Sequence, residues 1–194
     1  MTKLTLVLGD ITHQRVDALV NAANFTLLGG SSGVDRAIHA GAGPALTLAC
    51  RELRASRYSR GLATGQSVAT TAGRLQARWV IHTVGPRWDR YDDRSSLLAS
   101  CYRTSLEVAA ELGARTVALP AVSTGNLRWP LDDGARIAVR TVKETLAARE
   151  TTKAPANRAG EGRAGGQTFE EVRFVLFELR AHAAFETALA ALDA

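Results

Sequence analysis

Short apolar runs typical of β-strands alternate with longer segments of helical periodicity along most of this 194-residue chain. The apolar runs lie at residues 3–8, 16–23, 66–70, 78–84, 115–120 and 172–179. Helices are expected from about residue 34, from Pro44, over 93–112 and 131–149, and in the alanine-rich C-terminal stretch. Strands that alternate with helices favour a mostly parallel sheet, because each parallel connection needs a crossover that covers one face of the sheet. The sequence therefore predicts an α/β fold with helices on both faces.

The length fits one domain over residues 1–194, which can bury a core without disulfides or a structural metal. One segment inside it, residues 151–168 (TTKAPANRAGEGRAGGQT), has almost nothing to bury. Its Gly, Ala, Arg and Thr residues show no apolar periodicity, so we expect a flexible surface loop.

The two cysteines, Cys50 and Cys101, stand apart in helical stretches. The sequence holds neither a CxxC pair nor a Cys/His cluster, so no metal site and no cofactor are predicted. The N-terminal apolar run is too short for a signal peptide, and no segment approaches the roughly 18 apolar residues of a membrane span. Together with two free thiols, these features favour the cytoplasm and no membrane partner.

The net charge of +5 makes nucleic acid the first partner to consider. The basic residues are mostly single arginines with acidic residues among them, and the sequence has no Lys/Arg block. An anionic small ligand accounts for a mildly positive field equally well, so nucleic acid is the less favoured partner.

The first loop, which we define as residues 29–33 (GGSSG), leads into a predicted helix. Small residues let a backbone approach phosphate closely, and the N–H groups of a helix N-terminus favour anions. Asp35, in the first helical turn, is either a helix-stabilising carboxylate or a general base that orients water. Asn24, just before the loop, is either a turn residue or a ligand for a sugar hydroxyl. No GxxxxGK[ST] or GxGxxG pattern decides between a phosphate cradle and an ordinary turn.

The second loop, which we define as residues 122–130 (VSTGNLRWP), follows another predicted strand and begins with small residues. Two such loops at the carboxyl edge of one sheet could clasp a diphosphate from both sides. The alternative is an ordinary connection between a strand and a helix. A third segment, GDIT at 9–12, contributes Asp10, which is either an N-cap or an acceptor for an exocyclic amine such as that of adenine.

Six segments resemble, in order and spacing, the macrodomain family: GDIT at 9–12, VDALVNAAN at 16–24, GVDRAIH at 33–39, GAGP at 41–44, VIHTVGP at 80–86 and PAVSTG at 120–125. The similarity covers residues 4 to about 148, is weaker over 172–192, and looks closest to the MacroD-like branch. This resemblance implies a three-layer α/β/α macrodomain with a central mixed, mostly parallel sheet. It also implies metal-independent hydrolysis of ADP-ribose esters, both on protein Asp or Glu and in O-acetyl-ADP-ribose. The implied partners are ADP-ribose and ADP-ribosylated proteins.

The resemblance also assigns roles to positions of this chain. Asn24 would hold the distal ribose, and Asp35 would be the carboxylate associated with hydrolysis. Asp10 would bind the adenine amine, Ile11 would contact the base, and Phe177 would flank it. Backbone N–H groups near Gly33 and Val34 would bind one phosphate. The other phosphate would be bound by the second loop, through Ser123, Thr124, Gly125, Asn126 and Leu127.

Two departures from the family pattern fall in these loops. The first loop is one residue longer than the usual four glycines and holds Ser31 and Ser32. Serine lacks the freedom of glycine at positive φ, so the cradle is expected to differ in shape, although the hydroxyls could donate to phosphate. In the second loop Leu127 stands where an aromatic ring would cover the distal ribose. Arg128 replaces a glycine there, and it either bonds the diphosphate or points into solvent.

Three functions remain open from the sequence. Asn24 and Asp35 together favour a hydrolase, the altered loops favour a reader that binds ADP-ribose without turnover, and only the pI of about 9.8 favours a nucleic-acid-binding module. His39, one helical turn after Asp35, either orients that carboxylate or is a structural histidine. His82 is expected in the core, and two tryptophans near the loops could cover a pocket, namely Trp88 and Trp129.

Overall fold

The computed structural model describes residues 1–151 and 168–193. The strands in this part of the chain are β1 (Lys3–Leu8), β2 (Ala18–Ala22), β3 (Ser67–Thr71), β4 (Trp79–Thr83), β5 (Thr116–Leu119) and β6 (Glu171–Leu176). The α-helices are α1 (Gly33–Ala42), α2 (Pro44–Ser56), α3 (Ser95–Glu111), α4 (Leu131–Thr151) and α5 (Leu179–Asp193). A short 3-10 helix, η1 (Ile11–His13), follows β1.

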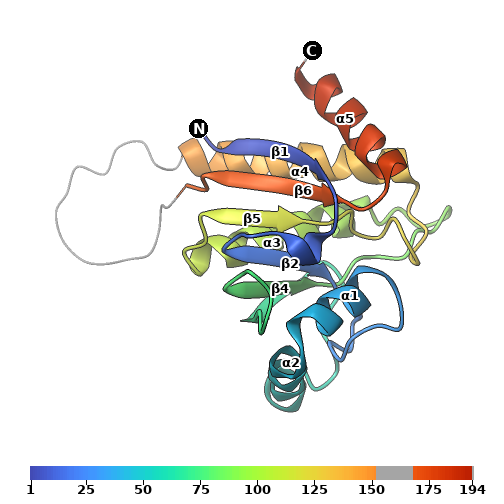
Figure 1. Cartoon of the computed structure of the whole chain (residues 1–194). Helices are drawn as coiled ribbons and strands as arrows, with labels where there is room; N and C mark the ends of the chain where they lie inside the picture. The colour runs from blue at the N-terminus through green and yellow to red at the C-terminus, as the bar shows by residue number, and fades with distance from the viewer. Residues whose placement is uncertain (152–167, 194) are drawn as a thin grey trace.

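The six strands form one sheet in the order β1-β6-β5-β2-β4-β3. All neighbouring pairs are parallel except β3 with β4, which are antiparallel. The sheet is therefore mixed and mostly parallel, and Figure 1 shows helices on both of its faces. The predicted three-layer α/β/α class is confirmed.

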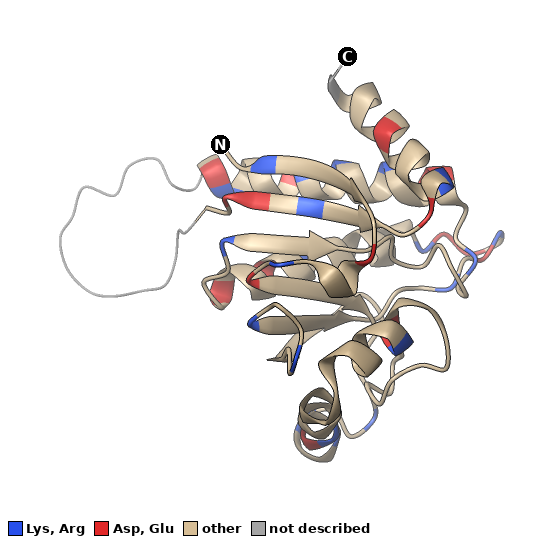
Figure 2. Cartoon of the chain, viewed as in Figure 1, with Lys and Arg blue, Asp and Glu red and all other residues tan. Residues whose placement is uncertain are grey.

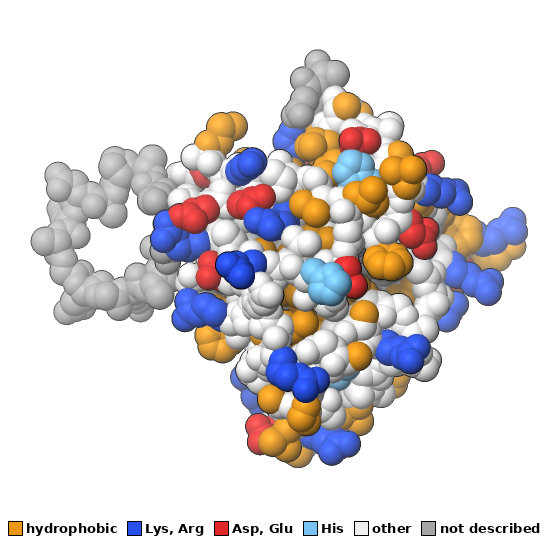
Figure 3. Space-filling model, viewed as in Figure 1, with side chains coloured by type: hydrophobic (Ala, Val, Ile, Leu, Met, Phe, Trp, Pro, Cys, Tyr) orange, Lys and Arg blue, Asp and Glu red, His pale blue; other side chains and the backbone are white. Residues whose placement is uncertain are grey.

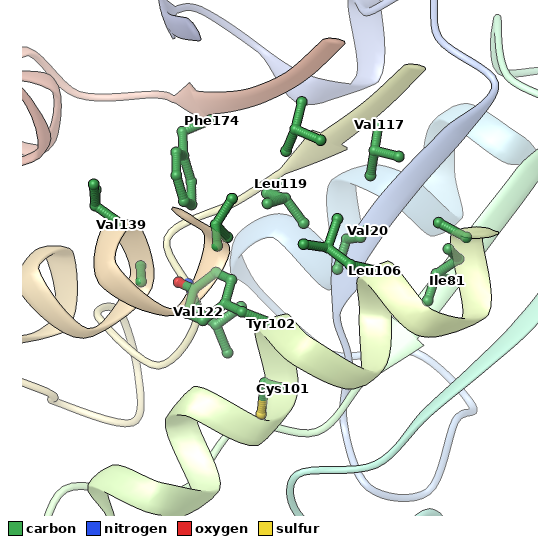
Figure 4. Close-up of a cluster of buried hydrophobic side chains, with 14 of the residues drawn as sticks. Val20, Ile81, Cys101, Tyr102, Leu106, Val117, Leu119, Val122, Val139 and Phe174 are labelled. Atoms are coloured by element: carbon green, nitrogen blue, oxygen red, sulfur yellow. The ribbon is translucent and has the colours of Figure 1, made fainter. Parts of the chain in front are cut away.

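Each face of the sheet has its own hydrophobic core, because side chains of a strand point alternately to the two faces. In β2, Ala18 and Val20 join the core with α3, α4 and α5, whereas Leu19 joins the core with α1 and α2. Figure 4 shows the larger of these cores, in which the ring of Tyr102 meets that of Phe174 edge-on with 6.0 Å between centroids. The four strands β2 to β5 carry no charged residue (Figure 2), as expected for strands buried on both faces.

Every apolar run expected to be a strand contains one, with ends shifted by at most three residues. The largest shift is in the last strand, which ends at Leu176 and not at residue 179. Phe177 therefore lies just beyond β6 and not inside it, in a bend before α5 that turns its ring toward solvent with 78% exposure. None of the helices in the described residues is both long and apolar enough to cross a membrane.

The predicted flexible loop at 151–168 lies outside the described residues except for its two ends. Thr151 is the last residue of α4, and Thr168 lies three residues before β6. Both ends are at the amino edge of β6, opposite the carboxyl ends of the parallel strands.

Candidate functional site

A cavity of about 590 Å³ opens at the carboxyl edge of the sheet. It is lined by the segments that follow four adjacent parallel strands, β1, β6, β5 and β2. This is the edge where ligands bind in open α/β sheets, because the loops that leave the strands converge there with the N-termini of helices.

The cavity brings together all of the sequence-predicted site residues, although they come from segments as far apart as residues 10 and 177. Lining residues are Asp10, Ile11, Asn24, Ser31, Ser32, Gly33, Val34, Asp35, Ser123, Thr124, Gly125, Asn126, Leu127 and Phe177. Their roles toward a ligand stay predictions, but their shared location allows one ligand to touch several of these segments.

No lysine, arginine or histidine lines this cavity among the described residues, whereas three carboxylates do, those of Asp10, Asp35 and Glu178. An anion bound there would therefore depend on backbone N–H groups and on neutral side-chain donors. The N-terminus of α1 supplies such groups, because its N-cap, Ser32, makes no side-chain hydrogen bond to them.

In the first loop the positions that need positive φ are glycines and not the two serines. The left-handed backbone conformation falls on Gly29 and Gly33, with φ of 89° and 68°, while Ser32 is extended with φ of −156°. Neither serine adopts positive φ, which agrees with the lower freedom of serine there, and the expected difference in shape from an all-glycine loop stays a prediction. Glycine is also needed at 29 for space, since a Cβ there would meet the His39 ring at 3.3 Å.

The second loop is held from below by a buried phenol. The Tyr102 hydroxyl donates to the Pro120 carbonyl at 3.3 Å and accepts from the Val122 N–H at 2.9 Å. Burial raises the pKa of Tyr102 well above its usual value, so it stays a neutral donor. Above this anchor Ser123 adopts φ of 68°, an uncommon conformation for a residue with a side chain.

Ser123 is packed against Gly85, which precedes the segment leading to α3. A Cβ at Gly85 would come within 2.2 Å of the Ser123 hydroxyl oxygen, so only glycine leaves room for it. That hydroxyl is buried and has no hydrogen-bond partner among the described residues. It is thus a buried polar atom behind the cavity wall that lacks a partner within the part of the protein that the structure describes.

The two loops touch across the cavity. The Asn126 side-chain amide donates to the Ser32 hydroxyl over 2.8 Å. This bond joins the lengthened first loop to the second loop, and the Ser32 hydroxyl makes no hydrogen bond to the N–H groups of α1.

Asp35 is buried, with 5% of its surface exposed, and both of its oxygens are engaged. Oδ1 accepts from the Asn21 side-chain amide at 2.7 Å, and Oδ2 accepts from the Asn24 backbone N–H at 3.0 Å. His39 lies 3.4 Å from Oδ1 through Nε2, without the geometry of a hydrogen bond. The carboxylate therefore ties the end of β2 to α1 at the cavity floor, and the prediction that His39 lies beside it is confirmed in position.

Asn24 is exposed at the cavity, and its side-chain oxygen accepts from the Thr26 N–H at 3.0 Å. Asp10 makes the equivalent local contact, since its Oδ1 accepts from both the N–H and the hydroxyl of Thr12 at 2.8 and 2.7 Å. Both residues thus serve as turn or cap residues while they line the cavity. The two interpretations from the sequence are compatible, because each side chain has a second polar atom.

Arg128 is exposed with φ of 59°, and it does not line the cavity. Of the two orientations left open by the sequence, this placement favours solvent. Trp129 is in the core, where its indole N–H donates to Asp133 at 2.9 Å, and Trp88 is 41% exposed. Neither tryptophan lines the cavity, so the suggestion that they cover a pocket is wrong for this cavity.

Sequence reasoning missed the residues that support the site from inside. Asn21 on β2 and His82 on β4 are register partners, both fully buried, and only 3.2 Å separate Asn21 Nδ2 from His82 Nδ1. The sequence does contain one signal for them, because each is a polar residue inside an apolar strand. Their pairing could not be found from the sequence, because it depends on which strands are neighbours.

The structure also corrects the inference that no Cys/His cluster exists. His39, Cys50 and His82 each place one possible ligand atom within 4.8 Å of the others. Both ring nitrogens of His82 are already engaged, however, since Nε2 lies 2.8 Å from the Thr70 hydroxyl. Burial, with a smaller effect of Asp35, raises the pKa of the Cys50 thiol to about 11, so the thiolate that a metal needs is disfavoured. We interpret the cluster as a hydrogen-bonded part of the core.

Comparison with known proteins gives a consistent result. A family model described as Macro domain matches residues 20–138. A macro domain-containing protein of Streptomyces griseus is 60% identical over 186 residues, which cover 95% of this chain and 93% of the relative. One from Lactiplantibacillus plantarum is 42% identical over 193 residues and covers 99% of each.

Solved structures resemble the whole fold. The Oceanobacillus iheyensis macrodomain with ADP has a TM-score of 0.83 and 34% identity, and the match covers 98% of this chain and 91% of that one. The Trypanosoma brucei macrodomain in complex with ADP-ribose has a TM-score of 0.76 and 33% identity, and the match covers 96% of this chain and 68% of that one.

Proposed function

This chain belongs to the macro domain family, and from that premise we propose that it binds ADP-ribose and hydrolyses ADP-ribose esters. The substrates are proteins mono-ADP-ribosylated on Asp or Glu and the small ester O-acetyl-ADP-ribose. Water adds across the ester, so that a free carboxylic acid and ADP-ribose are released.

Binding of ADP-ribose is supported by the shape and polarity of the cavity. Two loops face each other across it, and one of them opens α1 with N–H groups left for an anion. A diphosphate between the loops would leave Asp10 and Phe177 at one end for adenine and Asn24 at the other for the distal ribose. Macrodomains with ADP or ADP-ribose are among the structures most like this one.

Hydrolysis is supported by one observation above all, the fixed carboxylate of Asp35 at the cavity floor beside Asn24. A catalytic group must be held within a fraction of an ångström of its productive position, and Asp35 is held by two hydrogen bonds at 2.7 and 3.0 Å. In the proposed reaction Asp35 and the bound phosphate orient water, and Asn24 holds the distal ribose. No step needs a metal or another cofactor.

The alternative is a reader that binds ADP-ribose without turnover, and one observation favours it. Both Asp35 oxygens already accept hydrogen bonds within the protein, which is what a purely structural carboxylate would do. A carboxylate oxygen has two lone pairs, however, so each can accept a further bond from water.

A nucleic-acid-binding module has less support. Figure 3 shows basic side chains scattered among acidic and hydrophobic ones on the face in view. The two buried free cysteines fit a reducing compartment, and we propose that the protein acts in the cytoplasm.

Release of ADP-ribose decides between the hydrolase and the reader. The wild-type protein is incubated with an Asp/Glu-ADP-ribosylated protein and, separately, with O-acetyl-ADP-ribose, and free ADP-ribose is measured over time. Calorimetry with ADP-ribose and with adenosine runs in parallel. We expect turnover of the esters and much weaker binding of adenosine, because the loops are built around the diphosphate.

Tight ADP-ribose binding without release would establish the reader. Equal affinity for adenosine would mean that the loops do not bind the diphosphate.

Asp10→Ala is expected to weaken ADP-ribose binding by roughly 1–3 kcal/mol through loss of one partner in a buried polar contact. A gel shift with nucleic acid that weakens steeply with salt, in the absence of ADP-ribose binding, would favour the third class.

A further inference from the structure

A chain of buried hydrogen bonds runs from the core to the cavity floor. It starts at the Thr70 hydroxyl on β3, passes through the His82 ring on β4 and the Asn21 amide on β2, and ends at Asp35. The three residues below Asp35 are 0 to 6% exposed. Three neighbouring strands therefore place a polar group in line with the candidate catalytic carboxylate.

The direction of each hydrogen bond in this chain follows from what the groups can donate. An ionised carboxylate only accepts, so the Asn21 nitrogen faces Asp35 and donates. The same nitrogen faces His82 Nδ1, which must then accept and carry no proton. Burial, with a smaller contribution from His39, lowers the pKa of His82 to about 3, so the ring is neutral at ordinary pH.

A neutral ring without a proton on Nδ1 carries it on Nε2. That N–H donates to the Thr70 hydroxyl at 2.8 Å, and the hydroxyl donates in turn to the Thr71 carbonyl at 3.1 Å. Every donor from Thr70 to Asn21 thus meets an acceptor. The opposite amide orientation would turn the Asn21 oxygen toward the Asp35 carboxylate, where two acceptors would meet.

We propose that His82 is a positioning residue for the hydrolysis: its Nδ1 acceptor fixes the Asn21 amide in the orientation that donates to Asp35. His82 does not touch the cavity, and its effect reaches the substrate only through Asn21 and Asp35. This inference rests on the proposed hydrolase function. It predicts that an acceptor at the Nδ1 position matters for turnover, whereas the Nε2 contact with Thr70 matters mainly for the ring's own placement.

Two substitutions of the same residue separate these roles. In His82→Asn the amide oxygen can occupy the place of Nδ1 and still accept from Asn21. In His82→Gln the amide nitrogen can occupy the place of Nε2 and still donate to Thr70, while the acceptor toward Asn21 is lost. Both variants remove ring volume from the same buried position, so each serves as the structural control for the other.

We expect His82→Gln to lower kcat by about 10- to 100-fold, because an Asp35 displaced by a fraction of an ångström loses its water-orienting geometry. We expect His82→Asn to keep kcat within about threefold of the wild type and KM to change by less than about threefold in both. A further control is Cys50→Ala, which disturbs the same ring from its Nε2 side and should leave kcat unchanged. An equal fall of kcat in both His82 variants would overturn the proposal, since loss of volume alone would then account for it.

A second measurement uses the unsubstituted protein and does not depend on turnover or on the folding of a variant. Long-range ¹H–¹⁵N correlation spectra of the imidazole nitrogens report which nitrogen of His82 carries the proton. We expect the neutral Nε2–H form between about pH 5 and 8, before and after addition of ADP-ribose. A protonated Nδ1 at His82 would overturn the proposal even in an active enzyme, whereas wild-type protein without turnover would instead refute the proposed hydrolase.

Discussion

The wall built by the first loop with α1 and the wall built by the second loop face each other across the cavity, and they are fixed by different means. Under the first wall lies the buried carboxylate of Asp35, which accepts hydrogen bonds from one side chain and one backbone N–H. The left-handed residues of this wall are glycines, Gly29 and Gly33, which adopt that conformation without strain.

The second wall relies on its backbone. Ser123 and Arg128 both adopt positive φ without being glycine, at 68° and 59°. Backbone bonds hold them there, from the Trp129 N–H to the Ser123 carbonyl at 3.0 Å and from the Arg128 N–H to the Gly125 carbonyl at 2.9 Å. The first wall should therefore respond to changes of charge and amide orientation, and the second to changes of backbone strain and anchoring.

The largest effect is expected from Asp35→Ala in the first wall. Loss of the carboxylate should lower the hydrolysis rate about 100-fold, or roughly 2.7 kcal/mol, because Asp35 acts mainly in the transition state. ADP-ribose affinity should fall by less, about tenfold or below, since Asn24 loses the partner of its N–H but keeps its side chain. Rates of ADP-ribose release and calorimetry check this. Arg36→Ala, one residue along the same helical turn but exposed, is the control, and full activity of Asp35→Ala would remove Asp35 from the catalytic role.

The buried histidine below the first wall should make stability depend on pH. The pKa of His82 is lowered to about 3 in the folded protein, against about 6.5 when unfolded, so the unfolded state binds more protons between these values. Stability is therefore intact above pH 6.5 and falls as the pH drops through that value. At pH 5 the loss is about 2 kcal/mol. Urea unfolding at pH 7 and 5 should show this fall in the free energy of unfolding for the wild type and a smaller fall for His82→Asn. An equal fall in the two proteins would mean that folding does not lower the pKa of His82.

In the second wall, Tyr102→Phe should lower stability by roughly 1.5 kcal/mol. The substitution leaves the Val122 N–H and the Pro120 carbonyl without their phenol partner in a buried place. ADP-ribose affinity should fall as well, because the second loop loses its anchor. Phe174→Leu disturbs the same aromatic contact without touching the loop, so it should lower the melting temperature and spare affinity. If both variants weaken binding equally, the anchor does not act through the loop.

Backbone strain in the second wall should be visible as a gain in stability on Arg128→Gly. Glycine adopts the left-handed conformation without strain, which stabilises the folded state, but it also has more conformational freedom in the unfolded chain, which opposes folding. The net gain in stability is expected to be about 0.5–1 kcal/mol. Arg128→Ala keeps the strain and removes the guanidinium, so its melting temperature should not rise. ADP-ribose affinity should stay within about twofold in both variants, because the side chain is exposed and outside the cavity. A salt-dependent loss of affinity would show instead that Arg128 reaches the diphosphate.

The smallest effect is expected from a change in the segment between α4 and β6. Replacement of residues 152–167 by a short Gly/Ser linker should leave the melting temperature and ADP-ribose affinity nearly unchanged, since their sequence has no apolar periodicity. The flanking residues, Thr151 and Thr168, lie at the amino edge of β6, away from the cavity. A marked loss of affinity would place this segment over the ligand.

The sequence by itself determined the class of the fold and the segments that form the cavity. Alternation of apolar runs and helical periods is a local property, so the strands and helices could be predicted within a few residues. The small-residue loops after β2 and β5 carry their signal in a few neighbouring positions, and the order of six motifs identified the family. Phe177 was assigned to the cavity in this way even though its strand ends one residue earlier.

Only the tertiary structure decided how the candidate catalytic carboxylate is held. Asn21, Thr70 and His82 look like stray polar residues in apolar strands, and their connection to Asp35 exists because β2, β4 and β3 are neighbours in register. The environment that keeps His82 neutral includes His39, more than 40 residues away, and the contact between Ser32 and Asn126 joins segments more than 90 residues apart. Hydrogen-bond partners and desolvation are set by which groups meet in three dimensions, and a sequence read along one dimension does not contain that information.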